Sequence, residues 1–129
     1  MRATNTAQQP LIRIVDDDAS VRRALTRLVE SMGMRAQAYA DPAELLESEL
    51  VADAACLLLD VQLPGMTGFD LYERLCTGGT KRPVIFITAH PDGDARNRAT
   101  EAGAIAFLEK PFDDELLLAS IRDAIERSG

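Results

Sequence analysis

Acidic residues directly follow two of the short apolar runs in this 129-residue chain. Asp16, Asp17 and Asp18 follow the first run, and Asp60 follows a later one. Carboxylates gathered in one cleft repel each other, so they require a cation to compensate their charge. Their hard oxygen atoms suit Mg²⁺, for which Mn²⁺ could substitute. The pattern therefore indicates a magnesium site.

Two other polar residues stand at equivalent places, because Thr88 and Lys110 also follow apolar runs. Lys110 adds a fixed positive charge, and Thr88 adds a hydroxyl group that can rotate to donate a hydrogen bond. An Asp carboxylate can act as a nucleophile, and a metal ion with a Lys can neutralise the oxygens of a transferred phosphoryl group. Together these groups fit a phosphoryl group carried on a carboxylate.

Each of these residues also has an ordinary structural explanation. The three consecutive acids could cap the following helix, and Asp60 could be a turn residue before Pro64 and Gly65. Thr88 could cap the next helix, and Lys110 could be a solvated charge at a strand end. Their joint placement favours a site over four separate coincidences. His90, in contrast, is best explained as an exposed loop residue.

The segments between these residues have to bring them together. Five apolar runs predict strands over 11–15, 35–39, 55–59, 84–87 and 105–108. Segments of helical period alternate with them: one from Asp18 to Gly33, one from Asp41 to about Glu49, one from Thr67, one over 94–102 and one from Asp114. This order predicts an α/β fold with a single doubly wound, five-stranded parallel sheet and five helices. Ligands of such sheets bind beyond the carboxyl ends of the strands.

Composition excludes several classes of protein. The chain has 14 basic and 21 acidic residues, a net charge of −7, which argues against direct binding to nucleic acid or to an anionic membrane. No apolar run is long enough to span a membrane. Residues 1–10 are expected to form a polar tail and residues 11–128 one domain. Cys56 and Cys76 lack the spacing of a metal site or a disulfide framework, which favours a cytoplasmic location.

The chain resembles a receiver domain of bacterial two-component response regulators. Four motifs carry the resemblance, which is greatest to the nitrogen-fixation regulator subfamily: Ile14 to Asp18, Leu58 to Gly68, Ile87 to Ala89 and Lys110 to Phe112. The resemblance implies a flavodoxin-like strand order of 2-1-3-4-5. It also implies that the chain is a phosphorylated signalling domain with at most slow autodephosphorylation, and not an enzyme with its own substrate.

The resemblance further implies a role for each matching residue. Asp60 would accept a phosphoryl group from the phosphohistidine of a sensor histidine kinase, and Lys110 would contact that group. Mg²⁺ would be held by the carboxylates of Asp16, Asp17 and Asp60 and by the backbone carbonyl of Gln62.

Other implied roles concern switching and the lifetime of the phosphoryl group. Thr88 and Phe107 would switch together, and Gln62 and His90 would tune the phosphate lifetime. The peptide bond between Lys110 and Pro111 would be cis.

The fourth helix has an unusual composition, because only Ala95, Ala99 and Ala102 lie on its inward stripe. Burial stabilises in proportion to apolar area, so an alanine face anchors a helix weakly. We expect phosphorylation to move the surface formed by the predicted helix over 94–102, the strand over 105–108 and the helix from Asp114. This surface would then control a downstream partner, an output domain or a homodimer.

Three alternatives differ in class. The segment beginning at Asp16 is close to the nucleophile motif of haloacid-dehalogenase-like phosphatases, in which Asp16 would be the nucleophile. That family does not need Asp60 and requires a further acidic motif after Lys110. A flavodoxin-like cofactor binder should have a phosphate site rich in Ser, Thr and Gly. A phosphorylation-independent interaction module would not need the complete set of acidic, hydroxyl and lysine residues.

Overall fold

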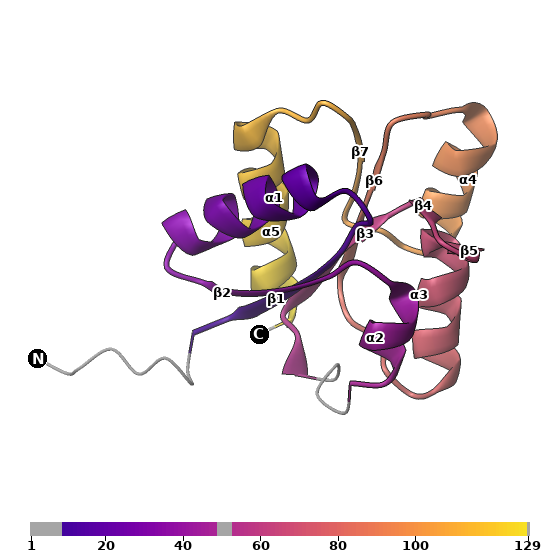
Figure 1. Cartoon of the computed structure of the whole chain (residues 1–129), viewed down its shortest axis with the longest axis horizontal. Helices are drawn as coiled ribbons and strands as arrows, with labels where there is room; N and C mark the ends of the chain where they lie inside the picture. The colour runs from indigo at the N-terminus through magenta and orange to yellow at the C-terminus, as the bar shows by residue number, and fades with distance from the viewer. Residues whose placement is uncertain (1–8, 49–52, 129) are drawn as a thin grey trace, which may run out of the picture.

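A five-stranded parallel sheet forms the centre of the computed structural model, which describes residues 9–48 and 53–128 (Figure 1). Its order is β2-β1-β3-β6-β7, which confirms the predicted 2-1-3-4-5 topology. The strands are β1 (Leu11–Val15), β2 (Arg35–Tyr39), β3 (Cys56–Asp60), β6 (Val84–Thr88) and β7 (Ala106–Glu109).

Helices cover both faces of the sheet (Figure 1). They are α1 (Ala19–Ser31), α2 (Pro42–Leu46), α3 (Gly68–Thr77), α4 (Gly93–Glu101) and α5 (Asp114–Ser128). One apolar cluster lies between the sheet and the pair α1 and α5, and a second lies between the sheet and the other three helices. Every residue of β1, β3 and β6 is buried, as expected for strands covered on both faces.

Side-chain caps explain where the helices begin. The Asp18 carboxylate accepts hydrogen bonds from the backbone N–H groups of Ser20 and Val21, so one of the three consecutive acids does cap α1. Thr67 and Asp70 form a reciprocal capping box at the start of α3. The predicted helix starts are therefore placed by local hydrogen bonds.

The structure corrects two expectations of the sequence and adds one element. The second helix ends at Leu46, well short of Glu49, which itself lies outside the described residues. The expected strand ends also shift, because Asp60 and Thr88 are the last residues of β3 and β6 and do not follow them. A small antiparallel hairpin, β4 (Gln62–Leu63) and β5 (Met66–Thr67), was not predicted. Strands of two residues are too short to produce a hydrophobic period.

The two cysteines are free, and Cys56 is completely buried in β3 while Cys76 is partly exposed on α3. Burial raises the pKa of the Cys56 thiol to about 12, which keeps it neutral and unreactive at neutral pH. Of the expected polar tail, only Gln9 and Pro10 are described, and the Pro10 carbonyl accepts a hydrogen bond from the Arg35 N–H. Among the described helices, none is long and apolar enough to cross a membrane.

Candidate functional site

Three carboxylates converge at the carboxyl end of the sheet. Oxygen atoms of Asp16, Asp17 and Asp60 all lie within 4.8 Å of one another. Asp16 and Asp17 follow β1 and Asp60 ends β3, and these two strands are paired directly in the sheet. Asp16 and Asp60 are buried, whereas Asp17 is exposed, so the cluster opens to solvent on one side.

Backbone groups orient the two buried carboxylates. The N–H of Asp18 donates to Asp16 Oδ1 at 2.9 Å, and the N–H of Gln62 donates to Asp60 Oδ1 at 3.1 Å. Each buried carboxylate thus has one oxygen held by the chain that follows it. The second oxygen of each carboxylate, Oδ2, is available to the site that the acids share with Lys110.

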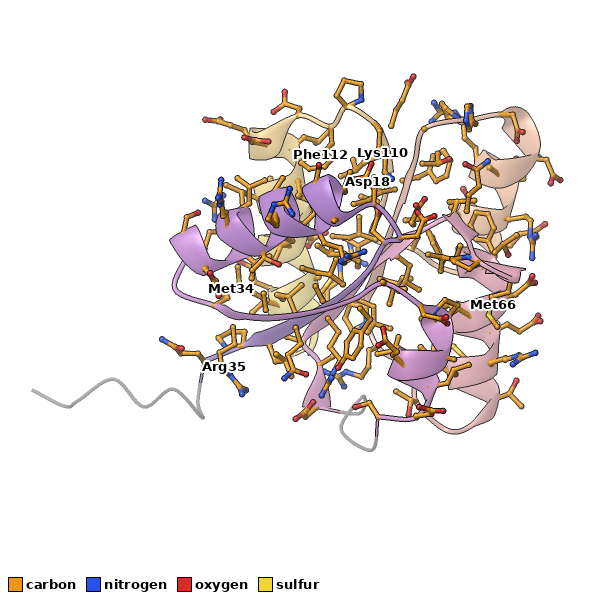
Figure 2. The ribbon with its side chains drawn as sticks, in the orientation of Figure 1. Asp18, Met34, Arg35, Met66, Lys110 and Phe112 are labelled. Carbon is orange, nitrogen blue, oxygen red and sulfur yellow. The ribbon has the colours of Figure 1, made fainter. Side chains whose placement is uncertain are left out.

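Lys110 reaches the second oxygen of both buried acids. Its Nζ lies 2.9 Å from Asp16 Oδ2 and 3.2 Å from Asp60 Oδ2. In Figure 2, Lys110 and Phe112 lie close to the start of α1, where Asp18 is labelled. Burial alone lowers the pKa of Lys110, but the carboxylates of Asp16 and Asp60 outweigh it and raise the pKa above its usual value. Lys110 therefore stays charged in this site.

Asp60 is affected in the opposite sense to a typical salt-bridged acid. Desolvation raises its pKa most, the Gln62 N–H lowers it, and the nearby charge of Asp16 raises it again. The net effect is a raised pKa, so the site without a metal ion disfavours the ionised form of Asp60. A further positive charge beside Asp60 would lower this pKa and favour the ionised carboxylate.

The donor set fits a divalent cation. Three carboxylates face a single ammonium group among the described residues of the cluster, so negative charge is in excess. Asp16 Oδ2 is buried, and it shares the Lys110 ammonium with Asp60 Oδ2. Buried anionic oxygens are costly unless cations compensate them, and one ammonium group faces three carboxylates here. Oxygen ligands with one open side suit Mg²⁺.

Thr88 lies on the strand next to Asp60, since β3 and β6 pair with Asp60 opposite Ile87. Its side chain is completely buried, and its hydroxyl oxygen accepts a hydrogen bond from the N–H of His90 at 3.0 Å. The Thr88 carbonyl accepts from the Lys110 N–H at 2.7 Å. Thr88 therefore links the end of β6, which lies beside Asp60, to the backbone of Lys110. His90 itself is exposed, as expected.

Phe107 lies on the edge strand β7 and is partly buried. The guanidinium of Arg96, on α4, is 5.3 Å from the centre of its ring, within the range of a cation–π contact. Phe107 is also paired with Phe86 across the sheet. The Lys110–Pro111 peptide bond, just beyond this strand, is cis, as the resemblance implies.

Comparison with known families decides the class of this fold and site. Residues 12–122 match the family described as the response regulator receiver domain. This chain belongs to the response regulator receiver family. Receiver domains are signalling domains, and they bind Mg²⁺ at an acidic cluster of the kind found here.

Three relatives illustrate how far the similarity of this receiver domain extends. Nodulation protein W of Bradyrhizobium diazoefficiens is 40% identical over 124 residues, which cover 96% of this chain and 55% of the relative. The transcriptional regulatory protein FixJ of Azorhizobium caulinodans is 36% identical over 117 residues, covering 91% and 56%. The structure of the response regulator StyR is 38% identical with a TM-score of 0.86, covering 93% and 61%.

These relatives support the subfamily similar to nitrogen-fixation regulators, and they do not favour the phosphatase alternative. The receiver domain spans about half the length of the curated relatives it matches. Its predicted limits of 11–128 remain a prediction beside the matched residues 12–122.

Sequence reasoning missed two residues that shape the site of this receiver domain. Gly68, the first residue of α3, lies so close to Asp60 that a Cβ atom there would be 2.3 Å from the Asp60 carbonyl oxygen. The Arg22 guanidinium donates to the Asp16 carbonyl at 2.8 Å. Gly68 could be recognised only as the last residue of a motif and as part of a helix start, and Arg22 only as a polar residue of a helix. Neither contact has a signal in the sequence, because in both the contacted atom is a backbone carbonyl oxygen, which every residue has.

Proposed function

We propose that this receiver domain accepts a phosphoryl group on Asp60 from the phosphohistidine of a sensor histidine kinase. One observation carries the proposal: Asp60 Oδ2 lies 3.2 Å from Lys110 Nζ, at the point where the oxygens of Asp16 and Asp17 converge. β3 lies between β1 and β6, so Asp60 has the acidic pair on one side and Thr88 on the other. Asp16 follows β1, whose other neighbour, β2, contributes no residue to this cluster.

The transfer forms one bond and breaks one. An Asp60 oxygen attacks phosphorus, the bond from phosphorus to the histidine nitrogen breaks, and the imidazole keeps that electron pair. Lys110 stabilises the negative charge that gathers on the phosphoryl oxygens. The carboxylates of Asp16, Asp17 and Asp60 and the carbonyl of Gln62 would hold Mg²⁺, or Mn²⁺ in its place. The ion would supply further positive charge for the same oxygens.

The surroundings of the site suit a partner that must bring its histidine to Asp60. A groove of about 380 Å³ lies beside Lys110 and is lined by Pro111 and Phe112 and by Ser20, Val21 and Ala24 of α1. A kinase that docks on this groove would bring its phosphohistidine beside Lys110, and the apolar side chains favour such docking. We place the reaction in the cytoplasm, where the free cysteines stay reduced.

Switching would begin at Thr88. Its hydroxyl can donate to a phosphoryl oxygen on Asp60, which would pull the side chain and the backbone near His90 toward the site. Phe107 and Arg96 would respond together, because they are in contact. The moving surface comprises α4, β7 and α5, and it would serve a downstream partner, an output domain or a homodimer.

Two exposed residues at the mouth of the site would set how long the phosphoryl group remains. Gln62 follows Asp60 by two positions and His90 follows Thr88 by two, and both are exposed. Their side chains can control the access of water to the acyl phosphate, so slow autodephosphorylation is the only turnover proposed.

The direct test is incubation with acetyl phosphate, with and without Mg²⁺, followed by intact-mass measurement and mapping of the modified residue. We expect one phosphoryl group per chain, on Asp60, and only with Mg²⁺ or Mn²⁺ present. Labelling on Asp16, or sustained release of phosphate from phosphate esters, would overturn the proposal in favour of the phosphatase.

A separate prediction concerns the weak anchoring of α4, which buries only the side chains of Ala95 and Ala99 among its described residues. Arg98 supplements this anchoring: its guanidinium lies 4.7 Å from the Phe69 ring centre and 3.4 Å from Asp70 Oδ1. Both contacts are partly exposed, so together they contribute about 1 kcal/mol. We expect Arg98→Ala to speed hydrogen exchange of α4 amides roughly fivefold while leaving α1 amides unchanged.

The matched control is Arg127→Ala, which removes a comparable exposed pair with Asp123 on α5. It should leave α4 exchange unaltered. If α4 amides of the unaltered protein exchange as slowly as those of α1, the weak anchoring of α4 is refuted.

A further inference from the structure

β2 presents a free hydrogen-bonding edge. The Arg35 N–H donates to the Pro10 carbonyl, and the Tyr39 carbonyl accepts from the Asp16 N–H, so the backbone groups of these two residues face β1. Backbone groups alternate in direction along a strand, so those of Ala36 and Ala38 face away from the sheet. Within residues 9–48 and 53–128, β2 pairs with β1 and with no other strand.

This edge has little of the usual protection, because Arg35 is the only charged residue of β2 and none of its five residues is Pro. Natural sheets protect exposed edges with charged side chains, Pro or bulges. Here the two outward-facing positions are alanines, and β2 pairs with β1 in unbroken register over all five of its residues. Among the described residues, no strand pairs with the outward backbone groups of Ala36 and Ala38, which are open to a strand from another chain.

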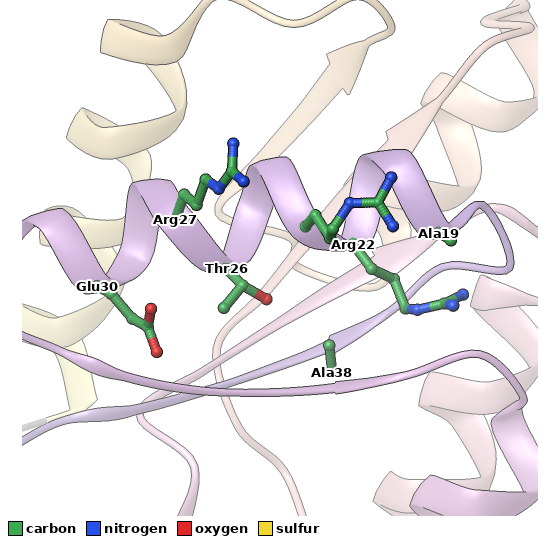
Figure 3. Close-up of a pocket in the computed structure, with 7 residues that line it drawn as sticks. Ala19, Arg22, Thr26, Arg27, Glu30 and Ala38 are labelled. Carbon is green, nitrogen blue, oxygen red and sulfur yellow. The ribbon is translucent and has the colours of Figure 1, made fainter.

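A positively charged groove accompanies the edge. Its volume is about 410 Å³, and it lies between α1 and β2 (Figure 3). Figure 3 shows Thr26 and Glu30 extending from α1 toward the strand that carries Ala38. Three arginines and one glutamate line the groove, a local charge of +2 on a chain whose net charge is −7; they are Arg22, Arg23, Arg27 and Glu30.

A second hollow continues along the same strand. Its volume is about 380 Å³, and it shares Glu30 with the first. Its other lining residues include Arg13, Arg35, Ala36, Gln37 and Asp53, so its charges balance and the excess positive charge belongs to the first groove alone. The two hollows together follow β2 from its first residue to Ala38. Space for an added chain is therefore present along most of the edge.

We propose that the free edge of β2 binds an extended acidic segment of a partner protein, which adds a strand to the sheet. The backbone of Ala36 and Ala38 would supply the hydrogen bonds, and alternate acidic side chains would face the arginines of α1. A second copy of this chain fits less well. Pairing two β2 edges would bring two sets of α1 arginines together and create like-charge repulsion.

The proposal does not rest on phosphoryl transfer, because neither hollow is lined by Asp16, Asp17, Asp60, Thr88 or Lys110. Arg22 lies in the groove and also contacts the Asp16 carbonyl, so the test substitutes Arg23 and Arg27 and leaves Arg22 in place. It can be tested on the whole chain without phosphodonor or Mg²⁺. The probe is a short peptide of alternating Thr and Glu, compared with one of alternating Thr and Lys. Binding is followed by NMR shifts and hydrogen exchange of backbone amides.

We expect the Glu peptide to bind at low salt, with the largest shifts and new exchange protection at Ala36 and Ala38, and the Lys peptide not to bind. Reversing two charges with Arg23→Glu and Arg27→Glu should weaken binding about tenfold or more. The control Arg122→Glu makes the same change on exposed α5 and should not alter binding. Ala38→Pro removes one outward N–H at a place where an edge strand tolerates Pro, and it should also weaken binding.

Several results would overturn the proposal. These are equal binding of both peptides, shifts without protection at Ala36 and Ala38, loss of binding in Arg122→Glu, and no binding at low salt. Concentration-dependent dimerisation that Ala38→Pro abolishes would assign the edge to a second copy of this chain. Unchanged amide shifts of β1, β3 and β6 in each variant establish that it is folded.

Discussion

Asp60→Asn is expected to abolish Mg²⁺-dependent labelling by acetyl phosphate completely. Asn has nearly the same shape as Asp, but its amide oxygen is a poor nucleophile and carries no charge for the metal site. Intact-mass measurement after incubation with the donor should show no phosphoryl group on the variant. The unaltered protein, treated in parallel, should carry one.

The loss should not arise from unfolding. Burial and the charge of Asp16 raise the pKa of Asp60, so ionisation of Asp60 opposes folding when no metal is bound. This opposition is present above the pKa of the folded state and disappears as pH falls below that of the unfolded state. In Mg²⁺-free buffer at neutral pH, Asp60→Asn should therefore unfold at the same urea concentration as the unaltered protein or a higher one.

Asp18→Asn provides the matched control for Asp60→Asn. Asp18 follows the two proposed metal ligands Asp16 and Asp17, but its side chain caps α1, and Asn caps a helix equally well. This variant should be labelled like the unaltered protein. Persistent labelling of Asp60→Asn would contradict the assignment of the acceptor.

Gly68→Ala is expected to destabilise the fold by about 1–3 kcal/mol and to slow phosphoryl uptake as well. The added Cβ would lie 2.3 Å from the Asp60 carbonyl oxygen and 3.3 Å from Val61 Cα. Gly68 cannot move away freely, because its N–H donates to the Val61 carbonyl at 2.8 Å. The displacement must fall on the backbone that carries Asp60. Urea unfolding and the rate of labelling measure the two effects.

Gly93→Ala is the control, since Gly93 is the first residue of α4 as Gly68 is of α3. A Cβ at Gly93 would meet nothing within 4 Å. This substitution should leave stability unchanged or raise it by about 0.4–1 kcal/mol. Equal stability of Gly68→Ala and Gly93→Ala would show that the close approach at Asp60 is relaxed at no cost.

The strands and helix starts were predictable because their causes are local. Leu57, Leu58 and Leu59 stand in one unbroken apolar run, which indicates a strand buried on both faces. Asp18 lies next to the backbone N–H groups that it caps. The short β4–β5 hairpin and the end of α2 could not be predicted in the same way, since neither has enough residues to show a period.

Arg13 shows what sequence periodicity cannot reveal. Its position in an apolar strand was evident, but its side chain is only 1% exposed, an unusual place for arginine. The guanidinium donates to Gln37 Oε1 at 3.0 Å and to the Tyr39 hydroxyl, and it lies 3.4 Å from Asp53. These partners come from β2 and from the start of the segment before β3, so only the folded chain assembles them.

The sequence by itself predicted which groups take part in the chemistry: acids after the first and third apolar runs, a hydroxyl after the fourth and a lysine after the fifth. It also determined that parallel strands bring them to one edge, because short connections between strands and helices allow few other topologies. The tertiary structure alone decided that Lys110 contacts both Asp16 and Asp60 and that Gly68 lies against the Asp60 backbone. It also decided that, within residues 9–48 and 53–128, the outer edge of β2 is unpaired beside three arginines. Distances between residues far apart in the chain depend on how helices and sheet pack, and that packing is a property of the whole fold.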